Sequence, residues 1–212
     1  MISQRALFNV APATFHMPEA MLGPMNEIMN QWARIENHHY QTNFQAVTDS
    51  TQVELHAHAV VKAFRTTHRI PSFGYCLMNR KTKLKKEFEN LSKGELDRIR
   101  HSGQSLSEQQ LEPLMAFTGD TQIEVFANNP WLLKVPVLIV ECTYLDNARD
   151  VKHARKWGHT HLDEILEILP QSHNQKILLT HLSPRYPLEF AKKIFAQRIP
   201  KQFQDLVEIF PF

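Results

Sequence analysis

The stretch "KILLTHLSPRY" at residues 176–186 predicts a buried strand that runs directly into a polar loop. Lys176 to Leu179 favours a short interior strand, because its apolar run is continuous rather than alternating. His181 then stands where a central strand ends, a position at which α/β proteins commonly hold ligands and metals. The alternative is a histidine whose ring is hydrogen-bonded to a neighbouring carbonyl group and binds nothing.

Strand and helix patterns alternate around this stretch. Apolar runs at 114–120 and 135–144 predict further buried strands. A helix with one apolar face follows them, and Thr160 with Asp163 fits a capping box at its start. Another helix, which begins with a proline, is predicted over 187–199. This order indicates an α/β fold with a sheet that is at least partly parallel.

The first half of the chain has a different pattern. Residues 24–36 predict a helix with one apolar face, which we expect to pack against a sheet. That face consists of Met25, Ile28, Met29, Trp32 and Ile35. Residues 44–77 are rich in the β-branched and aromatic side chains of strands. Residues 80–100 contain eight Lys or Arg against four Asp or Glu, which is typical of a solvated face and is the local charge that a polyanion would contact.

Composition sets the class of protein. A chain of 212 residues, 42% hydrophobic and 22% charged, is expected to form one folded domain. The net charge of +2 does not by itself indicate a nucleic-acid-binding protein. The sequence lacks the long apolar run of a membrane span and the pattern of a secretory signal. Two widely separated cysteines, Cys76 and Cys142, favour a reducing cytoplasm over a disulfide framework.

Three predicted strands end in side chains that can bind a metal. His68 follows "KAFRTT", Asp120 follows "MAFTG" and His181 follows "KILLT". If these strand ends lie together, two imidazoles and a carboxylate converge, which is part of a site for zinc or a similar divalent ion. Each residue alone is equally typical of a structural role, such as a turn at "TGDT".

His159 and His161 lie in "WGHTH", just before the predicted helix. One of them is suited to donate a proton to a leaving oxygen while a carboxylate orients its ring. The alternative, which applies more strongly to His161, is that these residues only form the start of the helix.

Five motifs in this order resemble the ribonuclease Z branch of the metallo-β-lactamase superfamily. They are "FRTTHRIPSFGY", "FTGDT", "VLIVECTYLD", "WGHTH" and "ILLTHLSPRY". The resemblance extends from residue 1 to about residue 187. It implies that His68, Asp120 and His181 are metal ligands, with Asp120 bridging two zinc ions. Manganese and iron are alternatives to zinc.

The resemblance also implies roles for four other residues. His159 matches a histidine that acts near the leaving group, and Glu141 is its acidic partner. Arg185 and Tyr186 match a pair beside the site, where an arginine can bind a phosphate through two hydrogen bonds. RNA, specifically a tRNA precursor, is the implied substrate, and a homodimer is the implied assembly.

The sequence departs from the family at its strongest signature, His-x-His-x-Asp-His, which is absent. "LHAHAVV" contains His56 and His58, but Val60 and Val61 stand where Asp and His belong. The fold class expected from the resemblance is therefore α/β, an incomplete metallo-β-lactamase-like αββα sandwich. Residues 1–212 are expected to form a single domain that lacks the N-terminal strands and the metal-binding loop of the family.

The family's glycine- and proline-rich arm, which grips tRNA, is not recognisable in residues 80–112. Three functions follow from the whole pattern. The first is a metal-dependent phosphodiester hydrolase of the ribonuclease Z type, with another phosphodiester or an ester as the alternative substrate. The second is a non-catalytic relative that acts by association. The third is a split enzyme, in which a partner chain supplies the missing ligands.

Overall fold

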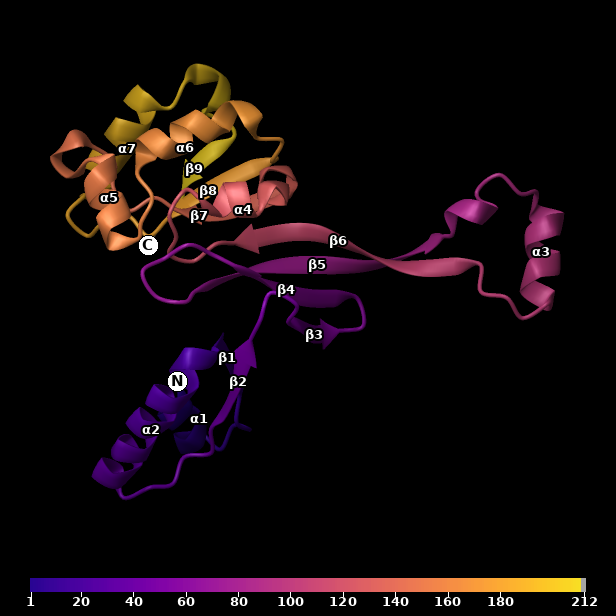
Figure 1. The fold of residues 1–212 in the computed structure, drawn as a ribbon, viewed down its shortest axis with the longest axis horizontal. Coiled ribbons are helices and arrows are strands. Elements are labelled where there is room, and N and C mark those ends of the chain that lie inside the picture. The colour runs from indigo at the N-terminus through magenta and orange to yellow at the C-terminus, as the bar shows by residue number, and fades with distance from the viewer. Residues whose placement is uncertain (211–212) are drawn as a thin grey trace.

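A computed structural model describes residues 1–210, and its main element is a mixed sheet of seven strands (Figure 1). The strands follow the order β3-β4-β5-β6-β7-β8-β9 across the sheet. Pairing is antiparallel from β3 to β6 and parallel from β6 to β9. The strands are β3 (Gln52–His56), β4 (Ala59–Arg65), β5 (Phe73–Leu84), β6 (Ser107–Phe117), β7 (Val137–Glu141), β8 (Lys176–Thr180) and β9 (Val207–Ile209). The prediction of an α/β fold with a partly parallel sheet is confirmed.

The helices of the C-terminal half gather around β7, β8 and β9 (Figure 1). They are α4 (Val125–Asn128), α5 (Val151–Trp157), α6 (Leu162–Ile168) and α7 (Leu188–Arg198). One row of residues in register across the sheet is almost completely buried and belongs to the same core as the apolar faces of α6 and α7. This row is Cys76, Ala116, Leu138, Ile177 and Val207.

The opposite face of the sheet is much more open. The next register row projects to that face, because side chains alternate along a strand. It is apolar as well, and we call it the open row: Tyr75, Phe117, Ile139 and Leu178. None of the four side chains is buried, and Phe117 is 44% exposed. A sheet with helices on one face and a partly uncovered apolar face on the other fits an incomplete αββα sandwich.

The N-terminal segment forms a small unit of its own kind. It consists of α1 (Ile2–Leu7), β1 (Thr14–Pro18), α2 (Leu22–Glu36) and β2 (Asn43–Val47), and β1 and β2 pair in parallel. The helix predicted over 24–36 is confirmed. The expectation that its whole apolar face packs inward is wrong, because Ile28, Trp32 and Ile35 are 57%, 45% and 75% exposed. That residues 1–212 form a single domain stays a prediction.

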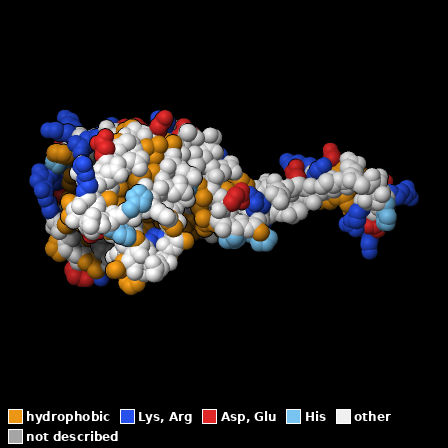
Figure 2. All heavy atoms as spheres, turned by 90° about the horizontal axis from the view of Figure 1, so that it is seen from below, with side chains coloured by type: hydrophobic (Ala, Val, Ile, Leu, Met, Phe, Trp, Pro, Cys, Tyr) orange, Lys and Arg blue, Asp and Glu red, His pale blue; other side chains and the backbone are white. Residues whose placement is uncertain are grey.

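Residues 80–112, in which the family's arm is not recognisable from the sequence, do form an arm. β5 and β6 pair along their length, from Tyr75 and Phe117 at the body to Leu84 and Ser107 at the far end. Beyond them, α3 (Lys93–His101) closes the tip. Figure 2 shows the arm as a narrow extension of the body, with Lys and Arg side chains gathered at its tip. Length and strand pairing build this arm without the glycine and proline content expected from the family.

The start of α6 differs in detail from the prediction. His161 is the residue before the helix, and its Nδ1 accepts a hydrogen bond from the Asp163 N–H at 3.1 Å. Glu164 Oε2 accepts from the His161 N–H at 3.0 Å, which completes the capping box. The predicted capping pair of Thr160 and Asp163 is therefore wrong, and the Thr160 hydroxyl donates to the Thr121 carbonyl instead. Among the described residues, no helix is both long enough and apolar enough to cross a bilayer.

Candidate metal centre

Four strands of the large sheet end at one edge and bring the candidate side chains together. β4 is antiparallel to β5, β5 is antiparallel to β6, and β6, β7 and β8 are mutually parallel. The C-terminal ends of β4, β6, β7 and β8 therefore lie at the same edge of the sheet, with the start of β5 between those of β4 and β6. His68, Asp120 and His181 follow three of these strands, and Glu141 is the last residue of β7.

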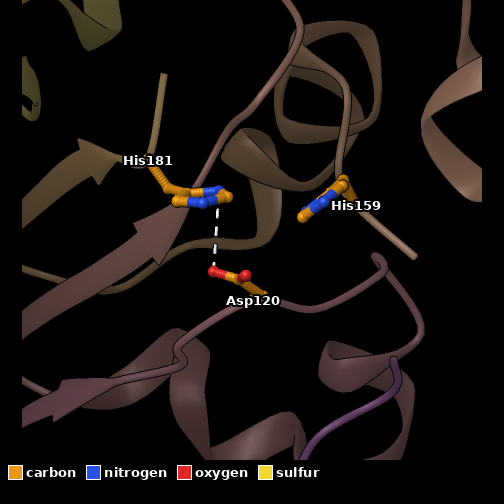
Figure 3. Close-up of side chains that lie close together, drawn as sticks. All are labelled: Asp120, His159 and His181. Carbon is orange, nitrogen blue, oxygen red and sulfur yellow. Dashed lines mark ion pairs between the residues drawn. The ribbon is translucent and has the colours of Figure 1, made fainter. Parts of the chain in front are cut away.

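A compact group of ligand atoms occupies this edge. Asp120, His159 and His181 each contribute one atom, and the three atoms all lie within 4.8 Å of one another. In Figure 3 the two rings and the carboxylate surround a common space. His181 Nδ1 lies 3.5 Å from Asp120 Oδ1. The ring of His68 lies beside the group, with its centroid 5.3 Å from that of His159.

Glu141 is completely buried behind this group and accepts four hydrogen bonds. Its Oε1 accepts from the Thr121 N–H at 3.0 Å and lies 2.9 Å from His159 Nδ1. Its Oε2 accepts from the Thr143 N–H at 3.1 Å and from the Thr143 hydroxyl at 2.7 Å. Burying a carboxylate costs free energy unless its oxygens accept hydrogen bonds, and here each oxygen accepts two.

The hydrogen bonds fix which ring nitrogen of each histidine carries a proton. His159 Nδ1 must donate, because the Glu141 carboxylate can only accept. The Thr143 hydroxyl donates its only hydrogen to Glu141. Towards His181 Nδ1, which lies 3.0 Å away, the hydroxyl oxygen can therefore only accept a hydrogen bond, so Nδ1 of that ring carries the proton. Each ring therefore keeps its Nε2 lone pair available for a metal or for a proton.

His68 has the same arrangement with a backbone partner. Its Nδ1 lies 2.8 Å from the carbonyl oxygen of Gly158 and must donate to it. Gly158 has a φ of +84°, and a Cβ there would overlap the His68 ring. Glycine is thus required at this position both by the backbone and by the close approach of the imidazole.

The backbone of His181 is strained. Its φ of 59° lies in the left-handed region, which residues other than Gly, Asn and Asp rarely adopt. Gly119, immediately before Asp120, has a φ of 62°. The two positive φ angles set the directions of the His181 and Asp120 side chains, each just after the end of a strand. Backbone strain of this kind is concentrated at functional sites.

The environment raises the pKa of His159. The hydrogen bond to the Glu141 carboxylate is the main cause, and the charges of Glu141 and Asp120 act in the same direction. Partial burial and Arg69 oppose the shift. His159 is therefore protonated more readily than an ordinary histidine, as suits a proton donor.

Arg185 and Tyr186 lie on the loop after His181, but their side chains differ. The Tyr186 hydroxyl accepts from the Leu145 N–H at 3.3 Å and donates to Asp146 Oδ1 at 3.1 Å, so it serves the structure. Arg185 is exposed at the rim of the site. Its predicted contact with phosphate is compatible with this position.

His56 and His58 do not join the group. They lie at the turn between β3 and β4, and both are exposed. His68 follows the other end of β4, and the seven residues of that strand span about 20 Å.

Two residues that sequence reasoning missed hold the histidines in place. Thr143 links His181 to Glu141, and the Gly158 carbonyl oxygen accepts a hydrogen bond from His68 Nδ1. The one signal available for Thr143 was a hydroxyl two positions after a buried acid at the end of a strand.

The donor set suits a divalent ion. Two imidazoles and one carboxylate, those of His159, His181 and Asp120, form the compact group, the ring of His68 lies beside them, and zinc prefers such nitrogen and oxygen donors. Second partners fix every ring, as is usual for metal-bound histidines.

Comparison with known proteins identifies the family. The chain is 32% identical over 190 residues to tRNase Z TRZ1 of Arabidopsis thaliana, a match that covers 89% of this chain and 68% of that protein. The chain belongs to the ribonuclease Z family. The chloroplastic tRNase Z TRZ2 of the same plant is 30% identical over 190 residues, and the chain spans only 54% of its length. No family model matches the chain.

The solved structures give the fold. The metallo-β-lactamase fold protein YhfI from Bacillus subtilis aligns with a TM-score of 0.57 at 14% identity, over 99% of this chain and 66% of that chain. The predicted membership of the ribonuclease Z branch and the predicted fold class are both confirmed. This member of the ribonuclease Z family corresponds to about two-thirds of a metallo-β-lactamase fold.

Proposed function

We propose that this chain is a metal-dependent phosphodiester hydrolase of the ribonuclease Z type, acting on RNA such as a tRNA precursor. The observation that carries the proposal is the convergence of Asp120, His159 and His181 at one sheet edge, with His68 beside them. Family membership supports the reaction class.

The residues divide into ligands and a proton donor. His68, Asp120 and His181 would hold the ion, for which zinc is the first choice. A bound divalent ion would polarise the phosphate and lower the pKa of a nearby water. His159, held by Glu141 and with a raised pKa, would donate a proton to the departing oxygen. Arg185 would bind a phosphate oxygen from the rim.

The arm is suited to bind RNA. Its tip carries exposed cationic residues that have no carboxylate partner among the described residues, and these include Lys86, Lys93 and Arg98. Such charges bind phosphate backbones without reading sequence. A cytoplasmic location and a homodimer stay predictions.

A split enzyme is the second candidate, and the open row favours it. Phe117 and Ile139 leave an apolar sheet face partly uncovered. A cleft of about 860 Å³, which His68 lines, separates the end of β1 and β2 from β4. A partner polypeptide with further strands and ligands would cover the face and complete the site.

Metal analysis and RNA cleavage test both candidates. Purified wild-type protein, a His68→Ala, His181→Ala variant and a His56→Ala, His58→Ala control are assayed for bound zinc and for cleavage of a tRNA precursor. Cleavage and zinc that disappear only in the first variant support the hydrolase. Zinc without cleavage favours the split enzyme, and wild-type protein with neither contradicts the hydrolase and favours the non-catalytic relative.

A further inference from the structure

A pocket of about 480 Å³ adjoins the metal centre and shares no lining residue with the cleft. It is formed by the residues after β7, by α5 and by the loop after His181. Its lining consists of Tyr144, Arg149, His153, Trp157, Ser183, Pro184 and Arg185. No carboxylate is among these lining side chains.

The charge of the pocket is positive and unneutralised. Arg149 and Arg185 form no ion pair with any described residue, whereas five other arginines do so. Asp146 lines a neighbouring hollow together with Arg149 and Arg185, and there it accepts a hydrogen bond from the Tyr186 hydroxyl and forms no ion pair with either arginine. Two guanidinium groups without partners favour an anionic ligand, and their planar geometry suits a phosphate.

Aromatic rings form the other part of the lining. The Tyr144 ring lies 5.2 Å from His153 and 6.4 Å from His159 between centroids, so the pocket begins next to the metal centre. Trp157 is 42% exposed, and the guanidinium of Arg69 lies 4.8 Å from its ring centroid. Tyr144 is partly buried and Trp157 is exposed, and accessible aromatic rings beside cations are the combination on which nucleic-acid bases stack.

We propose that this pocket binds one nucleotide of the RNA substrate, next to the phosphate that is cleaved. The base stacks on Tyr144 and Trp157, and Arg149 with Arg185 binds its phosphate. The proposal rests on the proposed function, because it assumes that the substrate is RNA. Beyond the proposed function, the pocket would bind a nucleotide through its base as well as through its phosphate. It would not distinguish one base from another, because stacking tolerates every base.

Binding to metal-free protein tests the pocket independently of catalysis. In EDTA, the dissociation constants of uridine 5′-monophosphate, adenosine 5′-monophosphate and ribose 5-phosphate are measured by NMR titration. Both nucleotides should bind at least about 5-fold more tightly than ribose 5-phosphate, because one base stacks. Trp157→Ala should remove this difference, and Arg149→Gln with Arg185→Gln should weaken all three ligands about 10-fold or more.

The controls are chosen to separate the outcomes. Trp32→Ala removes a tryptophan of similar exposure on α2, and Arg34→Gln removes a remote arginine; neither should change binding. Equal binding of nucleotides and ribose 5-phosphate to wild-type protein, or unchanged binding in the Trp157 and arginine variants, would overturn the pocket. Nucleotide binding in a protein that cleaves no RNA would leave the pocket standing and remove the proposed function.

Discussion

His181 shows how a single residue can serve the site at the expense of the backbone. Its left-handed φ of 59° directs the ring towards Asp120, and Thr143 fixes the ring through Nδ1. For most L-residues this conformation costs about 1–2 kcal/mol. A residue that tolerates the conformation but lacks the imidazole separates the two effects.

His181→Asn is expected to lose metal without losing stability. Asn accepts the left-handed region, so the free energy of unfolding of metal-free protein should stay the same or rise by up to about 1 kcal/mol. Urea unfolding in EDTA and zinc content after dialysis measure the two quantities. His56→Asn, at an exposed position remote from the site, should change neither. A marked loss of stability in His181→Asn would mean that the ring, not the backbone, dominates at this position.

Glu141 is expected to control the protonation of His159. In metal-free protein the pKa of His159 lies above 6.5, and Glu141→Gln should lower it, because the carboxylate is the main cause of the shift. The stabilisation linked to this shift is therefore present in full below pH 6.5 and is lost as the pH rises through the folded-state pKa. NMR titration of the imidazole resonances gives both values, and an unchanged pKa in the variant would contradict the assigned hydrogen bond.

The sequence predicted those site residues that have metal-binding side chains and directly follow a predicted strand. His68, Asp120 and His181 each followed an apolar run, and the topology places those ends together. The contacts of Gly158 could not be read in the same way. Its role depends on a left-handed turn and on an imidazole 90 positions earlier in the chain, and no local pattern records such a distance.

At the scale of secondary-structure elements, the junction between α5 and α6 positions His68. Gly158→Ala should lower the free energy of unfolding by at least about 1 kcal/mol, because the methyl group meets the His68 ring and the backbone is left-handed. Zinc affinity should fall as well. Urea unfolding and zinc titration measure these effects. Gly94→Ala is the matched control: it lies in α3 with open space around it, and alanine should stabilise that helix by up to about 1 kcal/mol.

The arm is expected to contribute RNA affinity rather than catalysis. Changing Lys86, Lys93 and Arg98 to Gln should weaken binding of a tRNA precursor. The slope of the logarithm of the binding constant against the logarithm of the salt concentration should also become less steep, by about one unit for each phosphate that the variant no longer binds. The measurement is binding in EDTA over a range of salt concentrations. Lys192, Lys193 and Lys201 changed to Gln remove the same charge elsewhere and should have a smaller effect. Equal effects in both variants would indicate net charge, not the arm.

Local sequence patterns predicted where helices and strands lie in the chain better than they predicted what packs against them. The helix over 24–36 was predicted from its spacing, yet Trp32 faces outward, because periodicity gives the apolar side of a helix and not what covers it. The arm was missed for a related reason. The outer halves of its two strands, residues 80–84 of β5 and 107–110 of β6, are mostly polar and exposed, so neither alternation nor burial marks them as strands.

At the scale of the whole molecule, both thiols lie in the core that joins the sheet to its helices. Cys76 and Cys142 are fully buried, and burial raises the pKa of Cys76 to about 11 and that of Cys142 well above its ordinary value. Native protein at pH 8 should therefore react with Ellman's reagent at neither thiol within minutes, and unfolded protein should react at two. Rapid reaction of one thiol in native protein would show that the sheet and its helices separate readily.

These inaccessible thiols give the chain a practical property. A cysteine introduced at Ser102, beside α3 at the tip of the arm, would be the single reactive thiol of the native protein. A fluorophore attached there would report whether the surroundings of the tip change when RNA, the proposed substrate, is added. The chain thus already provides a background without reactive thiols, on which a single label can be placed at the tip of the arm.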